Sequence, residues 1–276
     1  MTWPSVHRIG NTKGAPDSLA VGGGDDANLN KAAVALETRT NILMNRLMCE
    51  VWTKRTPAGA FAGSFTSVCW SGSLFVLVGT SGTIQTSPQG IKWTSRTAAS
   101  SYTGTFQSVC WSATLSLFVA VGATGAIQTS PDGTTWTSRT AGSSYAATFR
   151  GLAVSGSRVI AVGASGEVQT SNDGTTWTRR LSGATQFNSV VEIDSGVMVL
   201  VGDGGACQVS QDQGTSWSAF GTGTSSNLMA MALSAERRQL FYSGQAGEVG
   251  TIDMYSILVG APSNELRAVL SSSSLN

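Results

Sequence analysis

The stretch Ser130-Pro-Asp-Gly133-Thr-Thr-Trp136-Thr-Ser-Arg-Thr140 decides the fold, because versions of it recur along the chain. The recurring tryptophans are separated by 41, 43, 41 and 40 residues, and they are Trp52, Trp93, Trp136, Trp177 and Trp217. Between consecutive tryptophans the order of features is constant. A Gly/Ser/Thr loop comes first, followed by an alternating segment such as Phe106–Trp111, an apolar run ending in glycine, a glycine turn and a short polar strand.

Each unit therefore contains four short strands bounded by Gly, Ser, Pro or Asp. A period near 40 residues with four strands per unit is typical of a β-propeller blade. Four complete units run from Phe65 to Phe220, and a fifth has three strands between residues 228 and 252 but lacks its tryptophan strand. The sequence predicts a mainly β fold, a five-bladed β-propeller with four-stranded blades over residues 50–256. We expect strand 51–56 to complete the fifth blade and remove an exposed sheet edge. A flat open array is the alternative.

The turns before the tryptophans resemble the Asp-box of sialidase-type (BNR) propeller repeats, S-x-D-x-G-x-x-W. Only Ser210-Gln-Asp-Gln-Gly214-Thr-Ser-Trp217 has the full spacing, and Gln89 replaces the aspartate in the first turn. An Asp carboxylate accepts backbone N–H bonds within such a turn, glycine takes a positive φ, and the tryptophan packs on the sheet. We therefore expect a structural role for the turn residues Asp132, Asp173 and Asp212 and for the five repeat tryptophans. Function has to be argued from sites and not from the fold.

Composition excludes several classes of protein. Of 276 residues only 12% are charged, and 17 basic against 16 acidic residues give a net charge of +1. Nucleic-acid binders and polybasic membrane-surface proteins carry a clear basic excess, so we expect no nucleic-acid partner and no membrane insertion. The four cysteines (Cys49, Cys69, Cys110 and Cys207) are scattered, and His7 is remote from them. We expect free thiols, no metal and no cofactor.

An enzymatic role is not expected. Sialidases with this repeat need an arginine cluster, a Tyr–Glu pair and an acid at the centre of the propeller, and the apolar inner strands here lack matching residues. A glycosidase pair would have to come from isolated carboxylates, namely Glu167, Glu192, Asp203 and Glu248. The sequence therefore predicts no catalytic residues. A glycan hydrolase ranks third among the candidate functions, after two non-enzymatic roles.

The N-terminal region has a different pattern. Residues 1–26 are polar and glycine-rich, which predicts an extended arm. Residues 27–49 predict a short helix with an a/d seam, spaced 4, 3, 4, 3, 4, formed by Leu29, Ala33, Leu36, Thr40, Leu43 and Leu47. A seam of this kind favours self-association as a coiled coil. One helix packing on its own propeller is the alternative. Residues 257–276 form a C-terminal tail.

The segment Gly23-Gly-Asp-Asp-Ala-Asn-Leu-Asn-Lys31 and its continuation Glu37-Thr-Arg-Thr-Asn41 resemble the region near the N-terminus of tailed-bacteriophage tail-fibre proteins. The resemblance covers about residues 20–47. It implies a virion protein made in the host cytoplasm, with its arm docked to other tail proteins, a homotrimeric stalk and a distal binding domain. A small propeller is less familiar at that distal position than a β-helix or a knob.

Aromatic residues in three of the loops between blades are candidates for ligand binding. Phe61, Tyr102 and Tyr145 each stand four residues before the Phe that opens the next strand. Aromatic rings in Gly/Ser/Thr loops suit sugar stacking, whereas the alternative is that they cover the top of the blade interface. The first four repeat tryptophans are each followed after three residues by an arginine, which could bind acidic glycans or pack between blades. These arginines are Arg55, Arg96, Arg139 and Arg180. The predicted function is attachment of a virion tail appendage to a host-surface glycan or receptor. The alternative is a structural virion protein (tail-tip, collar or capsid decoration).

Overall fold

The computed structural model describes residues 53–59, 61–234, 239–253 and 257. The chain divides into two compact units, Met1–Lys54 and Arg55–Asn276, and all of the described strands belong to the second. The predicted arm at 1–26, the predicted helix at 27–49 with its seam, Trp52 and residues 258–276 lie outside the described residues.

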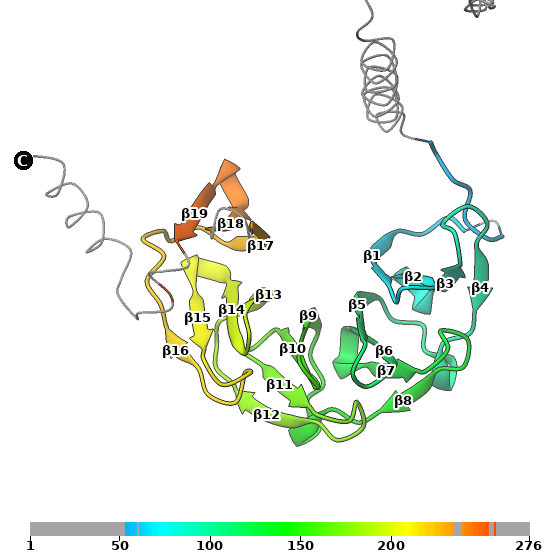
Figure 1. Ribbon diagram of the computed structural model, residues 1–276, viewed down its shortest axis with the longest axis horizontal. Helices are drawn as coiled ribbons and strands as arrows, with labels where there is room; N and C mark the ends of the chain where they lie inside the picture. The colour runs from blue at the N-terminus through cyan, green and yellow to red at the C-terminus, as the bar shows by residue number, and fades with distance from the viewer. Residues whose placement is uncertain (1–52, 60, 235–238, 254–256, 258–276) are drawn as a thin grey trace, which may run out of the picture. The chain divides into compact units, whose positions relative to one another are not determined.

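The described strands form five antiparallel sheets, four with four strands and the last with three (Figure 1). The first sheet contains β1 (Phe65–Trp70), β2 (Phe75–Gly79), β3 (Ile84–Ser87) and β4 (Thr94–Arg96). The second contains β5 (Phe106–Ser112), β6 (Leu117–Gly122), β7 (Ile127–Ser130) and β8 (Thr137–Arg139). The third contains β9 (Phe149–Ser155), β10 (Arg158–Gly163), β11 (Val168–Ser171) and β12 (Thr178–Leu181). The fourth contains β13 (Phe187–Asp194), β14 (Val197–Gly202), β15 (Cys207–Ser210) and β16 (Ser218–Ala219). The fifth contains β17 (Leu228–Ser234), β18 (Gln239–Gly244) and β19 (Val249–Asp253). The prediction of a mainly β chain of repeated antiparallel units is thus confirmed.

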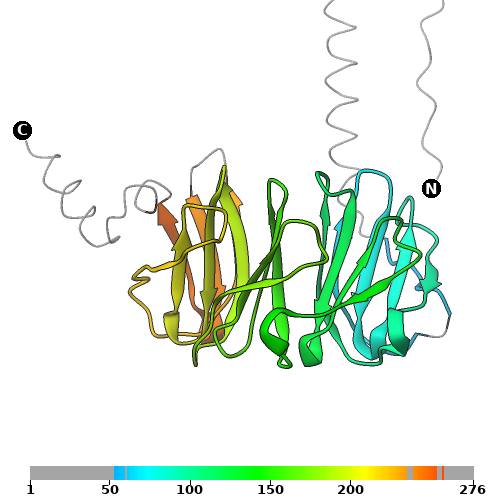
Figure 2. The ribbon, with the colours of Figure 1, turned by 90° about the horizontal axis from the view of Figure 1, so that it is seen from below.

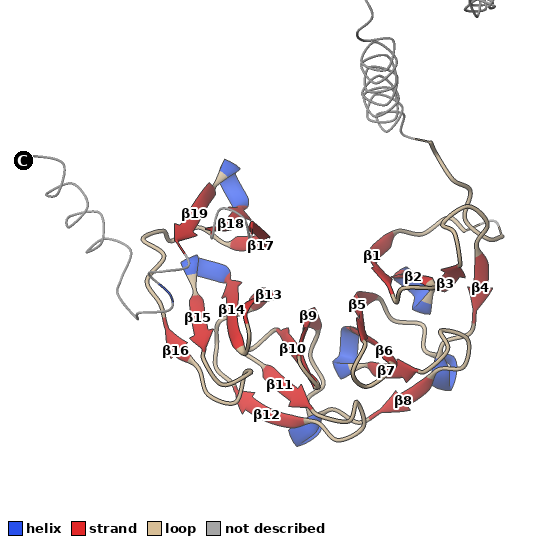
Figure 3. Cartoon of the chain, in the orientation of Figure 1, coloured by secondary structure: helices blue, strands red, loops and turns tan. Residues whose placement is uncertain are grey.

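Short 3-10 turns, the blue segments of Figure 3, connect or precede the strands. They are η1 (Thr80–Gly82), η2 (Ala99–Ser101), η3 (Ala123–Gly125), η4 (Gly142–Ser144), η5 (Asp203–Gly205) and η6 (Gln245–Gly247). Glycine is needed at the end of η1, because Gly82 has a φ of 65° and a Cβ atom there would lie 1.8 Å from the Tyr102 carbonyl oxygen. The Gly82 N–H donates to the Gly104 carbonyl at 2.6 Å. The turn between the second and third strands therefore lies beside the loop between sheets, and we call this side of the molecule the loop face.

Neighbouring sheets pack face to face, and Figure 2 shows their strands running between the two sets of turns. Each sheet has a forward face toward the next sheet and a backward face toward the preceding one. Between the first two sheets, Val76, Val78 and Ile84 of the forward face pack against Phe106 and Phe118 of the backward face. Three further buried clusters fill the three remaining interfaces in the same way. The core is therefore a series of four dry interfaces, one between each pair of consecutive sheets.

The prediction that strand 51–56 closes the fifth blade is not met over residues 53–56, the part of this segment that the structure describes. Thr53 to Thr56 have no strand conformation and are exposed, and the fifth sheet has only its own three strands. Two residues beyond this segment, the backbone of Ala58 is held by the side chain of Gln85 in the first sheet. The chain at this point is thus tied to the first sheet. The fifth sheet keeps an unpaired β19 edge among the described residues.

Candidate functional site

The Asp-box-like turns contain the hydrogen bonds that a structural role requires. The Oδ1 atom of Asp132 accepts backbone N–H bonds from Thr134 and Thr135 at 2.7 and 2.8 Å, and the Asp173 carboxylate accepts the equivalent pair at 2.7 Å each. In the turn with full spacing, Asp212 Oδ1 accepts from the N–H groups of Thr215 and Ser216 at 2.9 and 2.8 Å. These carboxylates face their own backbone.

The same contacts explain the acidity of these groups. Backbone hydrogen bonds from Thr176 and Thr175 lower the pKa of Asp173 to about 2, and bonds from Thr135 and Thr134 lower the pKa of Asp132. For Asp212, partial burial alone would raise the pKa, but the bonds from Ser216, Ser210 and Thr215 outweigh it and bring the pKa to about 2. All three carboxylates are therefore ionised near neutral pH.

The described tryptophans of the repeat pack beside these turns. Trp136 and Trp177 are buried in the interfaces before their own sheets. The indole N–H of Trp136 donates to the Gly133 carbonyl at 3.1 Å, and Trp217 makes the same bond to Gly214. Trp93, in the first sheet, is only half-buried.

A buried glutamine in the third strand of three sheets clasps the loop that leads into that sheet. Gln128 accepts from the Ala99 N–H at 2.8 Å and donates to the Ala99 carbonyl at 3.1 Å. Gln85 holds Ala58 and Gln169 holds Gly142 by the same two bonds. The sequence reasoning missed these residues, although the recurring Ile/Val-Gln-Thr-Ser segments carried the signal. The clasps set the position of the loops that bear the aromatic candidates.

The three aromatic candidates occupy equivalent, half-buried positions on the loop face. The Tyr102 hydroxyl donates to the Thr105 and Ala123 carbonyls, each at 3.1 Å, and the ring lies 4.7 Å from that of Phe106. Tyr145 makes the same contacts one repeat later, with its ring 4.6 Å from Phe149. Phe61 lies 4.6 Å from Phe65. Tyr102 and Tyr145 therefore each border the buried cluster between two sheets and are held by their hydroxyl bonds, whereas Phe61 lies against Phe65 of the first sheet.

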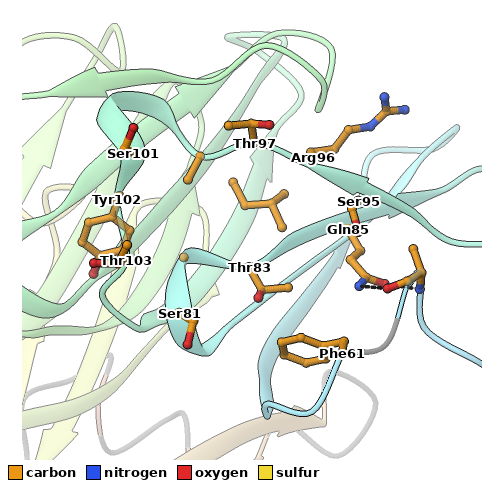
Figure 4. Close-up of a pocket in the computed structure, with 14 residues that line it drawn as sticks. Phe61, Ser81, Thr83, Gln85, Ser95, Arg96, Thr97, Ser101, Tyr102 and Thr103 are labelled. Atoms are coloured by element: carbon orange, nitrogen blue, oxygen red, sulfur yellow. Dashed lines mark hydrogen bonds between the residues drawn. The ribbon is translucent and has the colours of Figure 1, made fainter.

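The structure brings Phe61 and Tyr102 to one pocket of about 520 Å³, whereas Tyr145 lies one repeat away (Figure 4). The η1 turn supplies Ser81 and Gly82 to the lining, and Thr83 directly follows the turn. Hydroxyls of the β4 strand and the following loop complete the lining, namely Ser95, Thr97, Ser101 and Thr103. The side chain of Arg96 also borders the pocket, but Figure 4 shows its guanidinium directed away from both rings. The pocket thus combines aromatic rings with neutral hydrogen-bonding groups.

The recurring arginines have an internal partner in three sheets. The Nε atoms of Arg96, Arg139 and Arg180 each donate to a threonine hydroxyl of the adjacent third strand, at 2.8 to 2.9 Å. Arg55 is exposed. A different arginine, Arg179, forms an ion pair with the buried Glu167 at 2.9 Å.

Burial determines the state of the described cysteines. It raises the pKa of Cys69 and of Cys207 to about 12 and also raises that of Cys110, so these free thiols are protonated near neutral pH. Within residues 53–257, as far as the structure describes them, no group of His, Cys, Asp and Glu side chains is arranged to hold a metal ion. No helix among the described residues is long and apolar enough to cross a membrane.

No protein-family model and no curated protein sequence matches the chain. Among solved structures, it is similar to the WD40 β-propeller domain of Doa1, with a TM-score of 0.59, 12% identity and coverage of 72% of this chain and 68% of that one. YCF48 from Cyanidioschyzon merolae has a TM-score of 0.55 and 18% identity, covering 74% and 71%. The computationally designed protein Ika8 has a TM-score of 0.56 and 14% identity, and the match spans 72% of this chain but only 61% of Ika8. At these identities the likeness shows the β-propeller fold alone.

Proposed function

We propose that this chain is a tail appendage of a tailed bacteriophage that binds a glycan on the host surface. In this proposal, residues 1–49 dock to other tail proteins in the virion, residues 29–47 join three copies, and the propeller presents its loop face to the host. The resemblance of residues 20–47 to tail-fibre proteins supports the virion assignment. The β-propeller fold supplies a rigid scaffold on which loops can carry a binding site.

The observation that carries the proposal is the pocket between Phe61 and Tyr102. Sugars present hydroxyl groups at their rims and C–H groups on their faces, so a site for them combines hydrogen-bonding side chains with aromatic rings. The pocket offers both, with the hydroxyls of Ser81, Thr83 and Ser95 among the groups that line it. Its volume lies within the range of small-molecule sites. Since the Arg96 guanidinium points away from the rings, we propose a neutral sugar as the ligand.

The state of four described carboxylates favours binding over hydrolysis. Glycoside hydrolysis needs a carboxylic acid whose pKa is raised, together with a second carboxylate facing the same sugar. Asp132, Asp173 and Asp212 have lowered pKa values and face their own turns. Glu167 is paired with Arg179. We therefore propose that the appendage holds its glycan without cleaving it.

The test is binding of the full chain to an array of host-surface oligosaccharides, followed by two matched variants. Tyr102→Ala and Tyr145→Ala remove the same pair of carbonyl hydrogen bonds and the same ring contact, but only Tyr102 lines the pocket. We expect Tyr102→Ala to abolish binding and Tyr145→Ala to retain it. Equal losses in both variants would contradict the assignment of this pocket. Release of reducing ends during incubation with the bound polysaccharide would contradict the non-catalytic role.

A structural virion protein without receptor binding is the second candidate. The exposed apolar surface on the fifth sheet, which includes Phe241 and Val249, favours it, because such surface marks a site of protein assembly. Electron microscopy of an intact particle would separate the two, since a tail appendage and a capsid decoration occupy different positions on the virion.

A further inference from the structure

The four interfaces between sheets use one recurring arrangement of residues. On every forward face the second strand contributes two apolar residues, as Val119 and Val121 do in β6, and the third strand adds a residue such as Ile127. These pack on the first and second strands of the following sheet, including Phe149 and Val159. The contact is therefore heterologous, because a forward face always meets a backward face. One forward face and one backward face are left over at the two ends of the series.

The leftover forward face belongs to the fifth sheet and is apolar and exposed. Strand register places Phe241 and Ser243 of β18 beside Thr251 and Val249 of β19 on this face. Phe241 is 37% exposed, although Val76, Val119, Ile160 and Val199 at the same repeat position are fully buried. Val249 is 76% exposed, whereas Ile84, Ile127, Val168 and Cys207 at its repeat position are at most 4% exposed. The fifth sheet thus keeps the forward-face pattern without a following sheet to cover it.

Polar side chains that form hydrogen bonds across the first and fourth interfaces are replaced by apolar residues at the equivalent positions of the fifth sheet. In the first interface the Thr66 hydroxyl donates to the Phe106 carbonyl at 2.6 Å, and in the fourth the Asn188 amide donates to the Leu228 carbonyl at 2.9 Å. Met229 occupies this position in the fifth sheet and is 43% exposed. Ser67, which accepts from the Val109 N–H at 3.2 Å, corresponds to the exposed Ala230. At these two positions the fifth sheet therefore has no hydrogen-bonding side chain to satisfy, which suits an apolar contact.

The leftover backward face belongs to the first sheet. Val68 is 55% exposed, whereas Val109 and Val190 at the same repeat position are 5% and 7% exposed. Trp70 is 44% exposed and lies 4.3 Å from the ring of Phe75, which in turn lies 6.5 Å from that of Trp93. Three aromatic rings and a valine therefore form a second uncovered apolar surface, on the face that would receive a forward face.

We propose that these two faces bind each other between copies of this chain, with the fifth sheet of one copy seated on the first sheet of the next. The contact continues the interface that the chain already forms four times. The two faces of one copy do not meet, because Phe241 and Val68 are both exposed. Bringing them together would require rotation at four interfaces whose cores are fully buried, and close-packed cores resist such rotation. A second copy covers both faces without this cost, and heterologous contacts of this kind give closed rings or linear arrays.

The repeat also predicts which atoms meet. Since Ser67 contacts the backbone of Val109 across the first interface, Ala230 of one copy should lie beside Val68 of the next. The test uses the full chain with two affinity tags, co-expressed so that one copy carries Ala230→Cys and the other Val68→Cys. A short bifunctional thiol reagent should join the two differently tagged copies. Background cross-linking through native thiols is measured by the same treatment of three controls. These are two Ala230→Cys copies, two Val68→Cys copies and the unsubstituted protein.

A cross-link specific to the mixed pair is the expected result, and it does not depend on whether residues 29–47 also join copies. Phe241→Asp added to the Ala230→Cys copy should abolish the cross-link. Ile91→Asp is the matched control, because Ile91 is 54% exposed in a turn outside both faces. Thermal unfolding checks that each variant is folded. If Phe241→Asp does not fold, Ala232→Arg, at another exposed position of the same sheet, takes its place. Cross-linking at background level in the mixed pair, or equal cross-linking in the like pairs, would overturn the proposal while leaving the glycan pocket untouched.

Discussion

The side chain of Gln128 and the backbone of Ala99 form a two-bond clasp, in which the amide oxygen accepts from the N–H at 2.8 Å and the amide nitrogen donates to the carbonyl at 3.1 Å. Gln128 belongs to the second sheet, whereas Ala99 begins the loop that carries Tyr102. Because Gln128 is buried, the clasp satisfies backbone groups that water reaches poorly. The loop of the candidate site is thus held by the sheet that follows it.

Gln128→Leu should destabilise the protein by about 1–3 kcal/mol, because a residue of similar size leaves the Ala99 N–H without a partner and removes one of the two hydrogen bonds that the Ala99 carbonyl accepts. The free energy of unfolding in urea measures the effect. Gln208→Leu is the control, since Gln208 holds the equivalent position in the fourth sheet, is half-buried, and forms no side-chain bond to a loop among the described residues. A loss of equal size in both variants would show that the clasp contributes nothing specific.

Asp173→Ala should lower stability by about 1–2 kcal/mol, because the turn loses two backbone hydrogen bonds to the carboxylate. Glycan binding should not change, since the turn has no residue in the pocket between Phe61 and Tyr102. Urea denaturation and binding assays on the same preparation measure the two effects. A folded variant that no longer binds would refute the structural role of this turn.

Acid should weaken the fold through the same turns. The pKa of Asp173 is about 2 in the folded protein, against about 3.9 in an unfolded chain, so the unfolded state binds more protons between these values. This contribution to stability is complete above about pH 4 and is lost as the pH falls through about 2. The difference in unfolding free energy between the native protein and Asp173→Asn should therefore shrink from neutral pH to about pH 2. A difference that stays constant with pH would mean that the carboxylate charge is not involved.

The seam at residues 29–47, together with the resemblance of this region to threefold tail-fibre proteins, predicts a homotrimer whose contacts are weak. Ala33 and Thr40 bury little apolar area at two seam positions, so most of the stabilisation must come from the leucines. Leu43→Asp in the full chain should therefore lower the molar mass measured by light scattering at dilute concentration. Asn41→Asp adds the same charge at a position outside the seam and should leave the mass unchanged. A native protein that is already monomeric would contradict the seam and favour a helix that packs on its own propeller.

The repeating unit could be predicted from the amino-acid sequence alone, because the information for it is local. Alternation of side chains predicts each strand, and Gly, Asp and Trp at constant spacing predict the turns between strands. The four-stranded units and the three strands of the fifth could therefore be predicted from residues such as Phe106, Gly122 and Trp136. The aromatic residues of the loops were identifiable for the same reason, since they stand at a constant distance from the next strand.

Which of these local elements contact one another depends on the packing of whole sheets. Residues 53–56 do not form the expected strand, and the sequence could not reveal this, because an equivalent Trp-Thr-x-Arg segment contributes the fourth strand in the first three sheets. The clasp between Gln128 and Ala99, and the pocket that joins Phe61 to Tyr102, depend on contacts between residues 29 and 41 positions apart. Such contacts follow from how whole sheets stack. Stacking is set by the summed packing of many side chains and not by any one short pattern.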